Sequence, residues 1–287
     1  MKTSREKQAV IMMAVCAALW STAGIFIKLI PWHSMVICGL RSLLSAVVVY
    51  IYMKYQKIPI CLTKRSVLAS FTLALTFICF VIANKLTTAA NAIVLEFTSP
   101  IFILIMNALV FHQKIRHADA LVVGITMCGI TLFFFDQLGS GSLLGNFLGV
   151  FCGFCVACTY VFFGQSGKNE RMSGIFLGLL ISGVIGLPFA FWTPMEITVQ
   201  SVLTILALGI FQLGIPYVLF GLATGDCPPL ACNLIGAVEP LLNPIWVFLF
   251  NGEKPGTFAL IGSVIVIFAV TGWCILQDRT LKREQQC

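Results

Sequence analysis

Charged residues are scarce in this chain of 287 residues. Lysine, arginine, aspartate and glutamate together make up 10% of the sequence, whereas hydrophobic residues make up 59%. A soluble domain of ordinary composition carries about 25% charged residues. So few charges cannot keep a chain of this hydrophobicity in aqueous solution. The composition therefore excludes a soluble enzyme, a nucleic-acid-binding protein and a disordered regulator, and leaves a polytopic membrane protein.

The sequence also lacks the motifs of common catalytic and nucleotide-binding sites. It contains no HExxH, no GxSxG and no P-loop, and its three histidines, His33, His112 and His117, fall near the ends of apolar runs. A membrane enzyme acting on lipid would need a nucleophile or a set of metal ligands near the interface, and none is present. We therefore expect no enzyme activity, no cofactor, no metal site and no transport driven by ATP.

Long apolar runs fill most of the chain. A helix needs about 20 mostly apolar residues to cross the hydrocarbon core of a bilayer. Because the runs do not alternate, and because a helix satisfies its own backbone in lipid, helices are favoured over strands. The sequence predicts an all-α integral membrane protein with ten transmembrane helices. The ten runs are Ala9–Leu29, Ser34–Met53, Ser66–Ala83, Thr88–Phe111, Ala118–Phe135, Gly145–Phe163, Met172–Trp192, Gln200–Leu222, Pro229–Phe250 and Thr257–Leu276.

The basic residues indicate the orientation of these spans. With ten spans, 14 of the 18 basic residues fall on one side of the membrane, and only Lys28, Lys85 and Lys254 on the other. Arg41 lies inside a span. Since cytoplasmic loops carry the excess of lysine and arginine, both termini are expected in the cytoplasm. The predicted location is the cytoplasmic (inner) membrane, with the lipid bilayer and a small-molecule substrate as partners of a monomer or a homodimer.

The two halves of the chain resemble each other. Aligning the chain with itself at an offset of 140 residues gives 17 identities over the 127 pairs that start at Val10. The matching positions include Trp20 with Tyr160, which are both aromatic, and Pro100 with Pro240, which are identical. Each half contains five predicted spans. Because five is odd, the second half must be inverted in the membrane relative to the first.

An inverted repeat of this kind is typical of secondary transporters, whose substrate site lies near the midplane between the halves. The sequence predicts a first five-helix repeat over residues 9–135, a linker over 136–144 and a second repeat over 145–277. The linker is rich in glycine and serine, as flexible connectors are.

Short motifs in both halves resemble the drug/metabolite transporter superfamily, and in particular its EamA-type members with ten helices. In that family a proline in the fourth helix of each repeat is followed by an apolar run and a Gly-Glu pair before a basic residue. The second half has Glu239-Pro240 and then Gly252-Glu253-Lys254, and Leu19-Trp20-Ser21 also looks like the family. The first half departs from the pattern, with Ser99-Pro100 followed by His112-Gln113-Lys114. The resemblance implies transport of small molecules, commonly the export of amino acids or related metabolites.

Only three formal charges fall inside the predicted spans: Arg41, Glu96 and Glu239. A charge at the bilayer centre costs about 2.5–3.5 kcal/mol or more, so each should face a partner or a wet cavity. The helical rise places Glu96 about 12 Å, Glu239 about 15 Å and Arg41 about 10 Å into the membrane. The three charges could neutralise one another in a static pair, or they could bind a substrate or a coupling proton. For the two glutamates we favour the functional interpretation, and for Arg41 both interpretations remain open.

Polar residues fall on one helical face in the fourth span of each half. Residues at spacings of i, i+4, i+7, i+11 and i+15 share a face of a continuous helix. The face in the first half consists of Ala92, Glu96, Ser99, Ile103 and Asn107. The equivalent face in the second half consists of Cys232, Gly236, Glu239, Asn243 and Val247. A cavity lined by both faces would be asymmetric in charge, because neither glutamate is equivalent to the other.

Other residues are candidates by residue type. Stacking or cation–π contact with a substrate is possible for Trp20, Tyr160, Tyr217 and Trp246. Hydrogen bonding to a substrate is possible for Asn91, Asn233, Gln165 and Gln212. Helix kinks that free backbone carbonyls are expected at Pro100, Pro240 and Pro244. Close helix packing is expected at Gly145, Gly149, Gly153, Gly174 and Gly178.

Together these features predict a secondary transporter that works by alternating access. It would move small metabolites such as amino acids, in the direction of export, and a titrating carboxylate would couple transport to protons. Uncoupled diffusion or exchange fits the sequence equally well. The alternatives are a channel, a carrier of nucleotide sugars or sugar phosphates like those of organelles, and an efflux protein for cationic drugs. A carrier of anions would be expected to place several basic residues in its cavity, and here only Arg41 lies within a span.

Overall fold

The computed structural model describes residues 2–23, 26, 29–87, 89–110, 112, 114–133, 135, 142–239, 241–242 and 257–284. Over these residues the secondary structure is helical. The first half contains α1 (Lys2–Trp20), α3 (Ser34–Tyr55), α4 (Lys64–Leu86), α5 (Ala89–Glu96), α6 (Ser99–Leu109) and α7 (His117–Phe133). The second half contains α8 (Leu143–Gly164), α9 (Lys168–Gly186), α10 (Phe189–Trp192), α11 (Val199–Ala207), the π-helix η2 (Leu208–Gly214), α12 (Ile215–Ala223), α13 (Pro229–Gly236) and α15 (Thr257–Glu284).

Several helices begin where a hydroxyl caps the first turn. Thr63 and Ser66 form a capping box at the start of α4, and Thr198 and Ser201 form one at the start of α11. The Ser142 hydroxyl accepts a hydrogen bond from the amide of Gly145 at the start of α8. These side chains satisfy amides that have no partner within the helix, which is why the apolar segments become helical at these residues.

The prediction of ten spans is confirmed for six. In the described part of the chain, six helical segments are long and apolar enough to cross a membrane. They are Ser34–Tyr55, Lys64–Ala83, Ala92–Leu109, Leu143–Gly164, Lys168–Trp192 and Val199–Ala223. Two predicted spans correspond to shorter apolar helices, His117–Leu132 and Leu260–Trp273. The predicted spans Ala9–Leu29 and Pro229–Phe250 each extend into residues outside the described part.

Helix packing follows the repeat. α1 packs against α12, and α8 packs against α4. Since α8 is the repeat equivalent of α1, and α12 that of the middle of α4, the second contact is the first with the halves exchanged. The same exchange relates the contacts of α1 with α13 and of α8 with α5, while α3 packs against its own equivalent α9. The two halves are therefore interlocked around a common axis.

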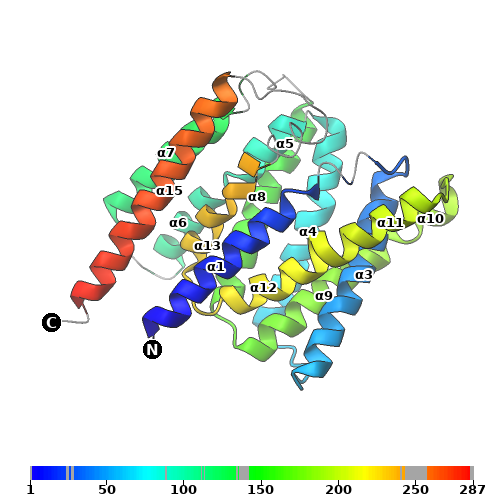
Figure 1. Ribbon diagram of the computed structural model, residues 1–287, viewed down its shortest axis with the longest axis horizontal. Coiled ribbons are helices and arrows are strands. Elements are labelled where there is room, and N and C mark those ends of the chain that lie inside the picture. Colours follow the sequence, from blue (N-terminus) through cyan, green and yellow to red (C-terminus); the bar gives the residue numbers. More distant parts are fainter. Residues whose placement is uncertain are drawn as a thin grey trace.

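The last helix of each half forms a separate pair. α7 and α15 pack against each other along their length and make few contacts with the other helices (Figure 1). The indole of Trp273 on α15 donates a hydrogen bond of 2.8 Å to the carboxylate of Asp119 on α7. The start of α1 and the end of α15 lie toward the same end of the molecule (Figure 1).

The glycines of α8 and α9 allow the close packing that the sequence predicts. A Cβ added at Gly145 would lie 2.8 Å from the carbonyl carbon of Leu86, and one at Gly174 would lie 3.0 Å from the carbonyl oxygen of Ser66. At Gly178 a Cβ would lie 3.0 Å from the carbonyl oxygen of Ser70. Small residues thus bring α8 and α9 into backbone contact with α4, as helices in lipid commonly require.

Candidate functional site

The fourth helix of each half is interrupted at the same place. In the first half α5 ends at Glu96 and α6 begins at Ser99, so the prediction of one continuous helix over Thr88–Phe111 is wrong. In the second half α13 ends at Gly236, and the backbone is helical again from Val238. Pro100, near the start of α6, has no amide hydrogen to donate to the carbonyl of Glu96, which explains the first interruption. Its counterpart Pro240 lies outside the described residues.

A glycine on α8 lies against the first interruption. A Cβ at Gly153 would lie 2.8 Å from the carbonyl oxygen of Glu96 and 2.6 Å from the hydroxyl oxygen of Thr98. Real Cβ atoms do not come this close to backbone oxygens. Glycine at this position therefore lets α8 support the backbone at the residue that carries the carboxylate.

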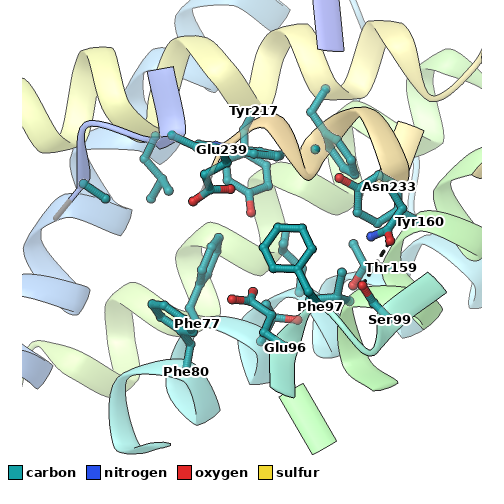
Figure 2. Close-up of a pocket in the computed structure, with 18 of the residues that line it drawn as sticks. Phe77, Phe80, Glu96, Phe97, Ser99, Thr159, Tyr160, Tyr217, Asn233 and Glu239 are labelled. Carbon is teal, nitrogen blue, oxygen red and sulfur yellow. Dashed lines mark hydrogen bonds between the residues drawn. The ribbon is translucent and has the colours of Figure 1, made fainter. Parts of the chain in front are cut away.

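The two interruptions border a cavity of about 140 Å³. Its walls come from both halves of the chain (Figure 2). The lining residues are Trp20, Ala23, Arg41, Leu73, Thr76, Phe77, Phe80, Glu96, Phe97, Ser99, Val156, Thr159, Tyr160, Gln212, Leu213, Tyr217, Phe220, Asn233, Gly236 and Glu239. Because the closest packing elsewhere brings backbones together, a cavity enclosed by so many polar side chains is a feature of the fold that needs a ligand or water to fill it.

Six pairs of these residues are repeat equivalents, separated by 140 positions. The pairs are Trp20 with Tyr160, Leu73 with Leu213, Phe77 with Tyr217, Phe80 with Phe220, Glu96 with Gly236, and Ser99 with Glu239. A residue and its equivalent can line the same cavity only if the cavity lies between the halves, near the axis that exchanges them. Three of the pairs are aromatic in both halves, whereas both pairs that contain a glutamate have it in one half only.

Aromatic rings form a continuous cluster around the cavity. The ring of Tyr217 lies 5.4 Å from that of Trp20, 5.4 Å from that of Phe77 and 5.7 Å from that of Phe220. The ring of Tyr160 lies edge-on to that of Phe220 at 5.0 Å. Such pairs are favourable geometries for aromatic rings, so the cluster holds the wall of the cavity in one arrangement.

Two carboxylates face each other across the cavity. Figure 2 shows Glu96 pointing inward from the end of α5, and Glu239 from the opposite wall just after α13. Glu239 lies within electrostatic reach of both Glu96 and Arg41. Among the described residues no ion pair within 4 Å joins Arg41 to either glutamate. The static neutralising pair that the sequence left open is therefore absent from this arrangement.

Several polar atoms at the cavity have no hydrogen-bond partner. Within the described residues these are Nε1 of Trp20, Nε of Arg41 and Oε1 of Gln212. Arg41 and Gln212 are 6% and 4% exposed. Buried polar groups are normally paired, and leaving one unpaired costs about 1–3 kcal/mol. These atoms are therefore available to a bound molecule.

A π-helix places Gln212 in the wall. The seven residues of η2 interrupt the eighth predicted span, and Pro216 follows close behind them. The hydroxyl of Ser45 on α3 donates a hydrogen bond of 2.8 Å to the carbonyl of Gly209 within η2. Sequence analysis did not predict this element. The nearby Gly209, Gly214 and Pro216 are the only signal that could have suggested an irregular helix there.

Hydrogen bonds join the halves on the far side of the cavity. The hydroxyl of Ser99 on α6 donates to the side-chain oxygen of Asn233 on α13 at 3.1 Å, as the dashed line in Figure 2 shows. The hydroxyls of Thr72 on α4 and Thr159 on α8 are 2.9 Å apart. Ser99 and Asn233 are 1% and 4% exposed. This part of the wall satisfies its own polar groups, unlike the part that contains Arg41 and Gln212.

The structure brings most of the predicted residues together. Those that line the cavity are Trp20, Arg41, Glu96, Ser99, Tyr160, Gln212, Tyr217, Asn233 and Glu239. Asn107 does not line it, and neither do Ala92 and Ile103 from the same predicted face or Gln165 after α8. The face does not continue because the helix is interrupted after Glu96. Asn243, Trp246 and Pro244 lie outside the described residues, as does the side chain of Asn91.

Sequence analysis missed several lining residues. They are Thr76, Phe77, Phe80, Phe97, Thr159 and Phe220. Phenylalanine is so common in an apolar chain that residue type alone carries little information. The repeat carried more, since Phe77 with Tyr217 and Phe80 with Phe220 are aromatic at equivalent positions.

Comparison with known proteins gives both a family and a fold. A family model described as the EamA-like transporter family matches residues 7–135 and again residues 143–273. The fold matches that of 29 solved chains. One of them, a crystal structure whose description names no function, is 14% identical, with a TM-score of 0.82. The match covers 96% of this chain and 99% of the other. At this identity the likeness concerns the fold alone, and no curated protein sequence matches the chain.

Proposed function

Because the chain belongs to the EamA-like transporter family, we propose that it is a secondary transporter that carries a small metabolite through the cavity between its two halves. The observation that carries the proposal is the set of six repeat-equivalent pairs that line one cavity. A site near the axis between two halves can open to either side of the membrane when the halves rock against each other. We place the protein in the cytoplasmic membrane, with five-helix repeats over residues 9–135 and 145–277 joined by a linker over 136–144.

Glu96 and Glu239 are the proposed ion-binding groups of the cavity. One or both bind the cationic group of the substrate, or the proton that couples transport. A carboxylate that is ionised when the cavity faces one side, and protonated when it faces the other, links proton movement to substrate movement. The two interruptions favour this role, since they place each carboxylate beside backbone that is not fully paired within a helix.

The substrate class supported best is an amino acid or related compound, carried in the direction of export. A second candidate is an apolar organic cation, which the aromatic rings and the two carboxylates would also accept. Carriers of nucleotide sugars and sugar phosphates handle strongly anionic solutes, and Arg41 is the only cation among the lining residues. The cavity therefore favours a substrate with a cationic group.

The Gln variants of both glutamates test the proposal. A thermal-shift screen of amino acids, amines and nucleosides on purified protein selects the solute, because a bound ligand raises the apparent melting temperature. Counterflow of that solute in proteoliposomes should saturate, as a channel would not. Glu96→Gln and Glu239→Gln should insert and fold, because removal of a charge lowers the cost of insertion. In at least one of them transport should fall about tenfold or more, or lose its dependence on pH.

The matched control removes a carboxylate outside the cavity. Glu196 lies exposed in the loop before α11, so Glu196→Gln should transport like the wild type. If both cavity variants fold and keep wild-type transport with unchanged pH dependence, the role of the glutamates is refuted. Counterflow that does not saturate for any solute in the screen refutes the transporter mechanism itself.

A further inference from the structure

The unpaired polar atoms of the cavity gather at one end of it. Arg41 belongs to α3 and Gln212 to η2, and these two elements pack against each other. The guanidinium carbon of Arg41 lies 6.0 Å from the centre of the Phe77 ring, and that ring lies 5.4 Å from Tyr217. The ring of Trp20 lies 5.4 Å from the same Tyr217. Arg41 and Trp20 thus approach one pair of rings, and each brings a buried N–H without a partner.

Those two unpaired N–H groups suit an anion. A guanidinium matches the geometry of a carboxylate with parallel hydrogen bonds, and an indole N–H can only donate. A lone organic cation would leave both donors unsatisfied and would lie close to the charge of Arg41. Because this end lacks a second cation among the lining residues, it fits one carboxylate better than a phosphate carrying two charges.

The neighbouring charges suit a cation. Glu239 lies within electrostatic reach of Arg41 on one side and of Glu96 on the other. The unpaired Oε1 of Gln212 can accept a hydrogen bond from an ammonium group. Donors for an anion and acceptors for a cation therefore occupy one small cavity, whose remaining wall is aromatic and aliphatic.

We propose that the cavity binds a zwitterionic amino acid with an apolar side chain, with its carboxylate on Arg41 and the Trp20 indole N–H and its ammonium group on Glu239. This inference rests on the proposed function and chooses between its two candidate substrate classes. The side chain lies among the rings that line both halves of the wall. Arg41 and Trp20 are then the residues that distinguish an amino acid from the amine of the same shape.

Matched sets of probes test this assignment. One set is leucine, 3-methylbutylamine, which lacks the carboxylate, and 4-methylpentanoate, which lacks the ammonium group. The other set is phenylalanine, phenethylamine and 3-phenylpropanoate. For at least one set, the purified wild type should bind the amino acid about tenfold or more tightly than either partner, a ratio that corresponds to 1.4 kcal/mol. Titrated thermal shift and counterflow give the affinities.

Variants connect the preference to the proposed residues. Arg41→Gln should abolish the advantage of the amino acid over the amine, and Arg41→Lys should retain part of it. Trp20→Phe keeps an aromatic ring but removes the N–H, and should reduce the same advantage. Lys54→Gln is the control, because it removes a cation from the same helix outside the cavity and should leave the preference unchanged.

Three results would overturn the inference. They are an amine that binds the wild type as well as its amino acid, a preference that survives in folded Arg41→Gln protein, and a failure of all six probes to bind. The proposed function fails separately, when no solute of any class shows saturable counterflow. Counterflow of an amine that depends on Glu96 or Glu239 would refute the zwitterion and support the organic-cation carrier.

Discussion

At the scale of residues, the two halves share the aromatic wall of the cavity but differ in its charges. Glu96 is matched by Gly236, and Glu239 by Ser99. Gly236 leaves open space in the wall, since a Cβ there would meet only the Tyr160 hydroxyl, at 3.5 Å. The duplicated residues therefore build the container, and the residues that differ give it a direction in charge.

Arg41 provides a test of whether its charge stabilises the fold. Since its Nε has no partner and no ion pair to it is found among the described residues, the structure predicts that the charge is kept at a cost in stability. Arg41→Met should leave the apparent melting temperature unchanged or raise it, because replacing a buried charge with an apolar group of similar volume is neutral or stabilising by about 1–4 kcal/mol. Thermal unfolding of ligand-free protein in detergent measures this.

A large loss of stability would contradict that prediction. Removing one partner of a buried ion pair costs about 3–5 kcal/mol, because the other charge is left unpaired. A fall of that size in Arg41→Met would show that a glutamate pairs with Arg41 in the ligand-free protein. Lys54→Met on the same helix controls for the loss of a positive charge as such.

At the scale of elements, irregular helices position the site. The interruption between α5 and α6 places Glu96 at a helix end, and η2 places Gln212 in the wall. Each irregular segment is held from outside, by Gly153 on α8 in the first case and by the Ser45 hydroxyl in the second. Transporters commonly use such broken helices at the midplane, because backbone freed from the helix can contact a ligand.

Gly153 tests the support of the first interruption. Gly153→Ala would bring a Cβ to 2.8 Å from the carbonyl oxygen of Glu96, so α8 or the interruption must shift. Overpacking of this kind typically costs about 1–3 kcal/mol. We expect a lower apparent melting temperature together with weaker transport, measured on the same purified sample.

The control is a glycine with space around it. A Cβ at Gly124 on α7 has nothing within 4 Å, so Gly124→Ala should not strain the packing. Alanine favours a helix over glycine by about 0.8–1.0 kcal/mol, so this variant should be as stable as the wild type or more so. Equal stability losses in the two variants would show that Gly153 has no special role.

At the scale of the whole molecule, the exchange of contacts between halves explains how one site can serve both sides of a membrane. The first helix of each half packs on the third helix of the other, which interlocks the halves around the cavity. α7 and α15 form a pair that makes few contacts with the rest. Motion of the interlocked helices about the axis would move the walls of the cavity without unfolding either half.

The distribution of basic residues predicts the orientation of the molecule. With both termini in the cytoplasm, a membrane-impermeant thiol reagent added to intact cells should not label Cys287, because the lipid bilayer keeps the reagent out. Glu196 lies in the loop that this orientation places outside, so Glu196→Cys should be labelled. Permeabilised cells should show labelling at both positions.

Labelling of Cys287 in intact cells would contradict this orientation. It would also put the number of spans in question, since one span more or fewer in the first half moves the basic loops to opposite sides. Absence of labelling at Glu196→Cys, with labelling at Cys287, would show that the whole molecule is inverted.

The sequence by itself determined the class of protein, the repeat and most of the charged site. The scarcity of charge and the length of the apolar runs require a membrane, because such a chain has no other solvent. The offset of 140 residues is enough to pair Phe77 with Tyr217 and Phe80 with Phe220. Glu96, Glu239 and Arg41 stood out because a charge inside a span is costly and therefore has a purpose.

Only the tertiary structure decided where the helices are interrupted and which side chains share a wall. Helical periodicity placed Asn107 on the same face as Glu96, but the face ends where α5 ends, so Asn107 does not reach the cavity. The π-helix that brings Gln212 inward depends on packing between α3 and η2, which no local pattern encodes. The separation of Arg41 from the glutamates was equally undecided, because an ion pair depends on distances between helices that are far apart in the chain, and these are set by the packing of the whole bundle.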